Sequence, residues 1–294
     1  MSDRLLSLAE GQHYPTGTLY VVATPLGNTA DITVRALHIL GMVDAIACED
    51  TRNSAQLLQR YGIDRPLIAA HEHNENAAAA RLVERLRAGE RVAYISDAGT
   101  PGISDPGARL VDAVRAAGLG VVPIPGASAV ITLLSAAGAW VESFTFVGFL
   151  PPKAQQRAQA IAALAASPCA QVFYEAPHRI VETVGALAAG LGAGRRLLIG
   201  RELTKRFEDI HECALGDGVA WLKADANRQR GEFVLAVSGA AANVAEDGVD
   251  AEAQRVLALL VAELPTKSAA KLAAAITGAP RNALYERALA LKNG

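Results

Sequence analysis

The chain has 294 residues, of which 51% are hydrophobic and 20% charged, and its formal net charge is −2. This composition is typical of a globular protein and excludes a largely disordered chain, while the near-zero charge gives no reason to expect a partner held by bulk charge. Cys48, Cys169 and Cys213 lie too far apart for a disulfide framework or a CxxC metal site. No apolar run approaches the ~20 residues of a membrane-spanning helix, so we expect a cytoplasmic protein with reduced thiols.

Strands and helices alternate steadily in the first half of the chain, after a weakly structured extension over residues 1–17. The predicted strands are 18–24, 44–48, 67–70, 91–95 and 119–124. The predicted helices are one with Asp31 as its N-cap, then 51–61, 75–88, 106–117 and 127–137. Such alternation predicts a mainly parallel sheet covered by helices, forming an α/β domain over residues 18–139.

A second α/β domain is predicted over residues 140–240, after a break that follows Gly138. Its predicted strands are 144–148, 171–174, 197–201 and 232–238, with a hairpin-like segment at 205–214. Its predicted helices are 153–166, 179–189 and 217–224. The pattern is less regular than in the first half, which indicates a more antiparallel sheet.

The C-terminal segment differs from both. Residues 241–250 are small and acidic, which is typical of a linker, and residues 251–294 carry apolar side chains at helical spacing. Pro265 and the Gly278–Pro280 turn divide this segment into three short helices, which resemble a helix-turn-helix unit. From residue 265 onward five basic residues oppose Glu286 alone, a net charge of +4. The segment is therefore either a nucleic-acid contact or a packing or dimerisation tail with a solvated charged face.

The loops lack the common phosphate-binding motifs. No GxGxxG follows the first predicted strand, where the sequence is ATPLGN, and no GxxxxGK[ST] occurs, which argues against nicotinamide and nucleotide-triphosphate enzymes. His71 and His73 do not have the spacing of a metal site, and no metal is expected. The long loop SDAGTPGISDPG, residues 96–107, stands between a predicted buried strand and a helix, at the position where open α/β sheets bind ligands.

Polar clusters follow several predicted strands. They are Glu49–Arg52, Ser96–Asp97, Gly126–Ser128 and Tyr174–Arg179. Because the carboxyl ends of strands converge at one rim of a sheet, a single cleft between the two domains accounts for all four clusters.

Seven motifs in this order resemble the tetrapyrrole methylase superfamily, and more narrowly its ribosomal small-subunit RNA methyltransferase I branch. They are TPLGN, CEDTR, SDAGTPGISDPG, PGASA, FYEAPHR, RELTKRFE and GEFV, and the C-terminal segment resembles the helix-turn-helix extension of that branch. The resemblance implies two α/β domains that bind S-adenosylmethionine in the cleft between them and transfer its methyl group to the 2′-hydroxyl of a cytidine in the decoding region of 16S rRNA. It also implies a homodimer. No DNA or membrane partner is expected.

Residues for the cofactor follow from this resemblance and from the need for close backbone approach at glycine-rich turns. The expected cofactor residues are Leu26, Asp97, Gly99, Thr100, Ser128 and Ala129, with Tyr174 closing over the ligand from the second domain.

Two carboxylates are candidates for orienting or deprotonating the acceptor hydroxyl, whose high pKa favours a proton acceptor. They are Asp50 and Glu175. Candidates for phosphate contacts are Arg52, Arg179, Lys205 and Arg206 near the cleft and Lys267, Lys271 and Arg281 in the C-terminal segment.

Two other functions remain open. One is a methyltransferase of the same superfamily that methylates a carbon of a corrinoid or porphyrin precursor. The other is a non-catalytic RNA-binding or ribosome assembly factor that keeps the fold as a scaffold. The basic C-terminal segment and CEDTR argue against the first, and the complete cofactor loops argue against the second.

Overall fold

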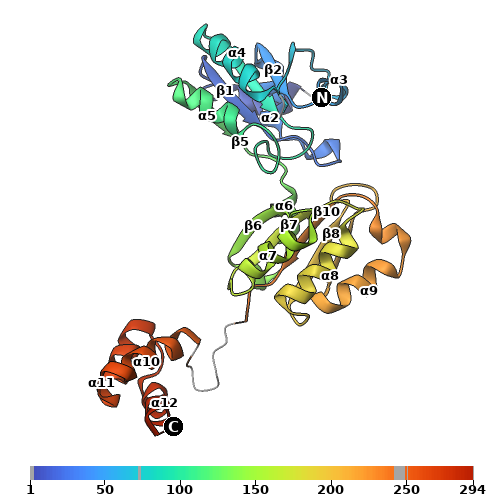
Figure 1. Cartoon of the computed structure of the whole chain (residues 1–294). Coiled ribbons are helices and arrows are strands. Elements are labelled where there is room, and N and C mark those ends of the chain that lie inside the picture. The colour runs from blue at the N-terminus through green and yellow to red at the C-terminus, as the bar shows by residue number, and fades with distance from the viewer. Residues whose placement is uncertain (1–2, 72–73, 242–248, 250, 294) are drawn as a thin grey trace. The chain divides into compact units, whose positions relative to one another are not determined.

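The first sheet is wholly parallel and has the strand order β3-β2-β4-β1-β5 (Figure 1). The computed structural model describes residues 3–71, 74–241, 249 and 251–293. The strands of this sheet are β1 (Thr18–Val22), β2 (Ala45–Cys48), β3 (Leu67–Ala69), β4 (Arg91–Ile95) and β5 (Gly120–Ile124). Strand β2 is buried at every residue, as expected for a parallel sheet covered on both faces. The predicted parallel α/β arrangement is confirmed.

Helices cover both faces of this sheet. They are α2 (Val34–Met42), α3 (Thr51–Arg60), α4 (Glu75–Arg87) and α5 (Ala108–Ala116). Ile39 of α2 and Leu58 of α3 pack in one apolar core, and Leu82 of α4 and Leu110 of α5 pack in the other.

Two predictions for this region were wrong. The extension, expected to be weakly structured, contains a helix, α1 (Asp3–Glu10), because its amphipathic sequence buries Ala9, whose carbonyl accepts a 2.8 Å hydrogen bond from the Tyr14 hydroxyl. The N-cap of α2 is Thr33, whose hydroxyl accepts from the Ala36 amide at 3.1 Å. The predicted cap Asp31 lies instead in a short 3-10 turn, Thr29–Asp31, that Asn28 caps.

The second sheet has the order β6-β7-β10-β8-β9, and only the β6 and β7 pair is parallel. Its strands are β6 (Phe144–Phe149), β7 (Ala170–Glu175), β8 (Arg196–Arg201), β9 (Asp209–Ala214) and β10 (Phe233–Val237). The helices of this part are α6 (Ala129–Ser135), α7 (Ala154–Leu164), α8 (Ile180–Leu191) and α9 (Gly218–Lys223). The predicted antiparallel character is confirmed.

Helix α6 follows the last strand of the first sheet along the chain, yet it packs on the second. Its Leu133 shares an apolar core with Val172 of β7 and Val234 of β10. The loop between β5 and α6 therefore runs from one sheet to the other, and the predicted division at residue 139/140 stays a prediction.

The C-terminal segment forms three helices, α10 (Ala251–Glu263), α11 (Thr266–Thr277) and α12 (Arg281–Asn293). They have a core of their own in which Leu257, Ala273 and Leu284 are fully buried. Gly278 ends α11 in the left-handed conformation, with φ of +76°, and permits the short turn into α12. The prediction of three short helices is confirmed.

Candidate functional site

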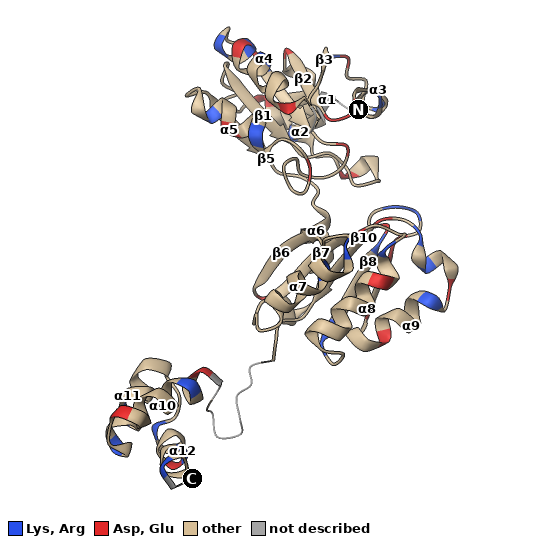
Figure 2. Ribbon diagram, viewed as in Figure 1, with Lys and Arg blue, Asp and Glu red and all other residues tan. Residues whose placement is uncertain are grey.

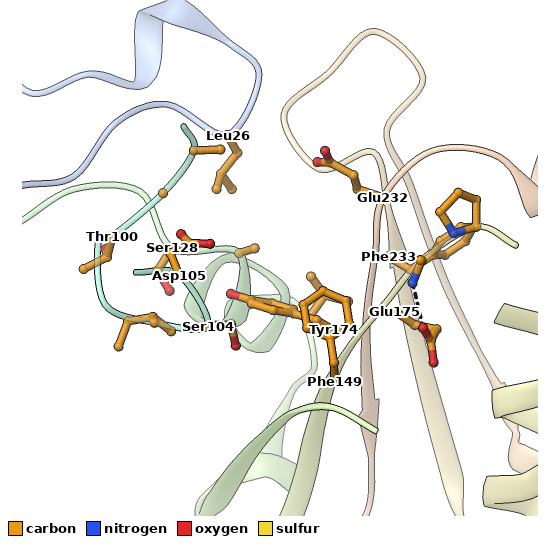
Figure 3. A pocket seen from close by; sticks show the side chains of 17 residues that line it. Leu26, Thr100, Ser104, Asp105, Ser128, Phe149, Tyr174, Glu175, Glu232 and Phe233 are labelled. Atoms are coloured by element: carbon orange, nitrogen blue, oxygen red, sulfur yellow. Dashed lines mark hydrogen bonds between the residues drawn. The ribbon is translucent and has the colours of Figure 1, made fainter. Parts of the chain in front are cut away.

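A pocket of about 320 Å³ lies among the loops that follow strands of the first sheet and the rim of the second sheet where β6 and β7 end and β10 begins (Figure 3). This volume is at the lower end of the ~300–1,000 Å³ range of small-molecule sites. The pocket is lined by Leu26, Ala98, Gly99, Thr100, Ile103, Ser104, Asp105, Ser128, Ala129, Phe149, Tyr174, Glu175, Ala176, Pro177, Glu232, Phe233 and Val234.

The first wall of the pocket is built by three loops joined through hydrogen bonds. Gly99 of the loop after β4 pairs with Thr24 in both directions, at 2.9 and 3.0 Å. The Thr100 hydroxyl donates to the carbonyl of Ala127, in the loop after β5, at 2.9 Å. These bonds hold the long 96–107 loop at a fixed place among its neighbours.

Gly99 is required at this place for two reasons. Its φ of +79° lies in the left-handed region, and a β-carbon there would come within 3.3 Å of the Leu26 side chain. A side chain at position 99 would therefore press on Leu26, which lines the same pocket.

Aromatic side chains form the second wall. The Tyr174 ring packs edge-on against Phe146 and Phe149, with centroid distances of 5.0 and 5.7 Å. Figure 3 shows the Tyr174 ring extending toward the loop that carries Ser104 and Asp105. Burial, and to a smaller extent the charge of Asp105, raise the pKa of the Tyr174 hydroxyl, so it stays protonated at neutral pH.

Six of the seven residues predicted to bind the cofactor line this pocket. They are Leu26, Gly99, Thr100, Ser128, Ala129 and Tyr174. The seventh, Asp97, is not among the lining residues, and its carboxylate accepts a 3.0 Å hydrogen bond from the side-chain amide of Asn53. The structure thus brings the six together, and their binding role stays a prediction.

Asp105 is a pocket residue that sequence reasoning missed. It lies within the same loop as Asp97 but lines the pocket, and it is half-buried. Burial raises its pKa, as does the charge of Asp97, while a hydrogen bond with Ser96 opposes the rise. The motif SDAGTPGISDPG contains both aspartates, and the sequence does not show which of them lines the pocket. The path of the loop decides this, and Ser104 within the loop has a φ of +64°.

The two predicted catalytic carboxylates have partners within the protein. Asp50 does not line the pocket and caps α3, accepting from the amides of Arg52 and Asn53 at 2.7 and 3.3 Å, and these bonds lower its pKa. Glu175 lines the pocket but is only 2% exposed, and it accepts from the Thr183 hydroxyl at 2.5 Å and the Ala176 amide at 2.8 Å. Their catalytic role stays a prediction.

The basic residues predicted to bind RNA fall into two groups. Arg179 donates to the carbonyl of Leu150 at 2.7 Å, and the Lys205 ammonium lies 2.9 Å from both Glu202 and Glu232. The remaining side chains are exposed. Figure 2 colours the ribbon blue at Lys and Arg and red at Asp and Glu. These exposed side chains are Arg52, Arg206, Lys267, Lys271 and Arg281.

Among the described residues, no group of three or more His, Cys, Asp or Glu side chains is arranged to hold a metal ion. His71 lies within the described residues, and its neighbour in the HEHNE motif, His73, lies outside them. In the part of the chain that the structure describes, no helix has the length and apolarity needed to cross a membrane.

The two sheets, with a pocket among the loops at their strand ends, define a two-sheet α/β fold. The model of the tetrapyrrole (corrin/porphyrin) methylases matches residues 18–218, and that of the RsmI C-terminal HTH domain matches residues 247–292. The chain belongs to the tetrapyrrole methylase family.

Curated relatives match both parts of the chain. The ribosomal RNA small subunit methyltransferase I of Pseudomonas aeruginosa is 50% identical over 93% of this chain and 97% of its own length. The protein of the same name from Escherichia coli O157:H7 is also 50% identical, over 93% of this chain and 95% of its own.

Solved structures share the fold at lower identity. The methyltransferase CobJ covers 77% of this chain and 95% of its own, with a TM-score of 0.58 and 21% identity. Uroporphyrin-III C-methyltransferase from Thermus thermophilus, complexed with S-adenosylhomocysteine, covers 75% of this chain and 97% of its own, with a TM-score of 0.53 and 17% identity. These likenesses show the fold alone.

Proposed function

We propose that this chain transfers a methyl group from S-adenosylmethionine to the RNA of the small ribosomal subunit. The observation that carries the proposal is the 50% identity to ribosomal RNA small subunit methyltransferase I across 93% of the chain, which includes both the two-sheet part and the C-terminal helices. Within the proposal, the acceptor is the 2′-hydroxyl of a cytidine in the decoding region of 16S rRNA, and the protein acts in the cytoplasm as a homodimer.

The pocket fits the proposed cofactor. A cofactor with an adenine ring and a methionine tail needs apolar surface beside exposed backbone donors and acceptors. Leu26 and Tyr174 supply apolar surface, and Gly99, which has no side chain, lines the pocket with its backbone. We assign the holding of the cofactor to these residues together with Thr100, Ser128 and Ala129.

When bound, the cofactor supplies an electrophilic methyl group on its sulfonium. The chain's own part is to position the acceptor and to take up its proton, because a ribose hydroxyl is almost entirely protonated at neutral pH. Asp50, Glu175 and Asp105 are the candidate proton acceptors. We favour Asp105 because it lines the pocket beside Tyr174, whereas Asp50 caps a helix and Glu175 is bonded to Thr183.

Tyr174 and its neighbours have a second task, which is to exclude water from the methyl group. The Tyr174 ring is held by Phe146 and Phe149, so its place in the wall is fixed before a ligand arrives. A preformed apolar wall strengthens the polar contacts made beside it.

The experiment is methyl transfer to small ribosomal subunits with the cofactor labelled in its methyl group, followed by mapping of the labelled nucleotide. Because 2′-O-methylation blocks alkaline cleavage, label in an alkali-resistant dinucleotide that begins with cytidine is the expected result. Label on a base would contradict the 2′-hydroxyl assignment. Transfer to a tetrapyrrole precursor and not to subunits would contradict the RNA substrate, and no transfer with intact subunit binding would indicate a non-catalytic binding factor.

A further inference from the structure

A second pocket lies beside the first, where β8 ends and β10 begins. Its volume is about 400 Å³, and it is lined by Arg201, Glu202, Phe207, Asn227, Arg230 and Gly231. Nothing in the proposed cofactor site uses these side chains.

Phe207 presents an aromatic ring to solvent at this pocket. Its side chain is 65% exposed, and the Arg206 guanidinium lies 5.6 Å from the ring centroid. The Arg201 guanidinium donates to the Phe207 carbonyl at 2.9 Å, which fixes the backbone that carries the ring. A fixed, exposed ring among arginines is the arrangement on which unpaired nucleobases stack.

The loop that carries Phe207 is preformed. Glu202 and Thr204 have φ of +51° and +67°, and the Glu208 carboxylate accepts a hydrogen bond from the Thr204 amide. The Lys205 amide donates to the Glu202 carbonyl at 3.0 Å, and the Glu208 amide donates to the Lys205 carbonyl at 3.1 Å. A ligand at Phe207 therefore meets a surface that is already ordered.

The charge at the pocket is positive. Arg201 and Arg230 line it, and its one acidic lining residue, Glu202, lies 2.9 Å from the Lys205 ammonium. Burial acts to raise the pKa of Glu202, but the hydrogen bonds from the Glu232 amide and from Lys205 outweigh it and lower the pKa. Glu202 therefore stays ionised, and Lys205 pairs with it and with Glu232. The two arginines against this one carboxylate leave the lining with a net charge of +1, which attracts a phosphate.

The two pockets are linked through Lys205. Glu202 lines the second pocket, Glu232 lines the first, and Lys205 bridges the two carboxylates at 2.9 Å on each side. This link would let a strand of RNA whose target ribose enters the first pocket reach the second pocket with an adjacent nucleotide.

From this arrangement we infer that the Arg201, Phe207 and Arg230 pocket binds an unpaired nucleotide next to the methylated one, with its base stacked on Phe207 and its phosphate at Arg230. The inference rests on the proposed function, and it assigns to the RNA substrate a site outside the cofactor pocket.

The test uses Phe207→Ala, Phe207→Tyr and Arg230→Ala in the full chain, with Arg115→Ala as a control on the exposed face of α5. We expect Phe207→Ala and Arg230→Ala to raise the KM for small subunits roughly 5- to 100-fold without changing the Kd for S-adenosylmethionine. Phe207→Tyr keeps a stacking ring and should remain near wild type. Arg230→Ala should also lower the slope of log K against log salt by about 1.

Binding of a labelled single-stranded oligoribonucleotide is measured with the same variants. Failure of the wild type to methylate subunits would contradict the proposed function. The binding measurement would still show whether the pocket at Phe207 binds RNA. If Phe207→Ala and Arg230→Ala had the same KM for subunits and the same Kd for the oligonucleotide as the Arg115→Ala control, the inference would be overturned. Melting temperatures of all variants verify that each one is folded.

Discussion

The side chain of Lys205 lies directly on Gly27, so that a β-carbon at Gly27 would come within 2.4 Å of Lys205 Cγ. Gly27 belongs to the loop after β1, and Lys205 belongs to the loop between β8 and β9. The Lys205 ammonium forms ion pairs with the carboxylates of Glu202 and Glu232. A glycine of the first sheet's loops and a lysine of the second sheet's loops are thus in contact, which brings the motifs TPLGN and RELTKRFE together.

Gly27→Ala is expected to displace Lys205 and to lower methyl transfer more than it lowers stability. The backbone of Gly27 has no positive φ, so the cost comes from the contact with Lys205 and not from backbone strain. Turnover on small subunits and thermal unfolding measure the two effects separately.

Gly41→Ala in helix α2 is the matched control, because a β-carbon there meets nothing within 4 Å. It should stabilise the protein by up to ~1 kcal/mol and leave turnover unchanged. Equal turnover in Gly27→Ala and Gly41→Ala would show that the contact between Lys205 and Gly27 has no part in the reaction.

Glu75 fixes the end of the long pocket loop. It is only 6% exposed, and one of its oxygens accepts from the amides of Gly107 and Arg109 at 2.9 and 3.2 Å. Glu75→Ala leaves these amides at the start of α5 without their acceptor, and we expect a loss of ~1–3 kcal/mol in the free energy of unfolding. Glu75→Gln keeps an acceptor oxygen and should lose less. Chemical denaturation of both variants measures the difference, and equal losses would contradict the capping role.

The sequence predicts the first sheet well because its strands are short apolar runs bounded by turn residues, as in β2 and β4. It does not predict that α6 packs on the second sheet, because an apolar helix face carries no mark of its partner. The choice between Asp97 and Asp105 is hidden for a similar reason, since a non-glycine residue, Ser104, adopts a positive φ within the loop. Of the two acidic partners of Lys205, Glu202 lies three residues before it in RELTKRFE, whereas Glu232 directly precedes β10, which sequence spacing does not reveal.

Asp50 should behave as a helix cap. Asn also caps helices well, so Asp50→Asn is expected to keep both the melting temperature and the turnover, while Asp50→Ala lowers the melting temperature by a few degrees. Thr33→Ala, which removes the cap of α2, is the matched control for cap removal. A large drop in turnover in Asp50→Asn with an unchanged melting temperature would instead assign Asp50 to the chemistry.

Deletion of residues 245–294 is expected to leave the affinity for S-adenosylmethionine intact and to weaken RNA binding. The three C-terminal helices have a core of their own and belong to a separate compact unit. Lys267, Lys271 and Arg281 are exposed, and removing the charge that neutralises one phosphate should lower the salt slope by ~0.9. A full-length chain with these three residues changed to Ala keeps the C-terminal helices but removes the three charges. It therefore separates the effect of the charges from the effect of removing the helices. RNA affinity and salt slope equal to wild type in both proteins would contradict the prediction.

Asp105 provides a prediction in which activity and stability change in opposite directions. Asp105→Asn removes the favoured proton acceptor, so we expect turnover on small subunits to fall by ~10²–10⁴. Burial raises the pKa of Asp105, which means that the folded protein binds this proton more tightly than the unfolded chain does. The free energy of unfolding therefore falls as the pH rises from the ordinary aspartate pKa of ~3.9 through the raised value, and at neutral pH the ionised carboxylate destabilises the fold.

Asp105→Asn should thus melt higher than wild type at neutral pH and lack this part of the pH dependence. Asp112→Asn, at an exposed aspartate on α5, is the control and should change neither property. Melting curves from about pH 3.5, near the ordinary aspartate pKa, to about pH 7 test the stability prediction, and turnover at saturating cofactor tests the activity prediction. Near-normal turnover in Asp105→Asn would return the role of proton acceptor to Glu175, because that carboxylate also lines the pocket.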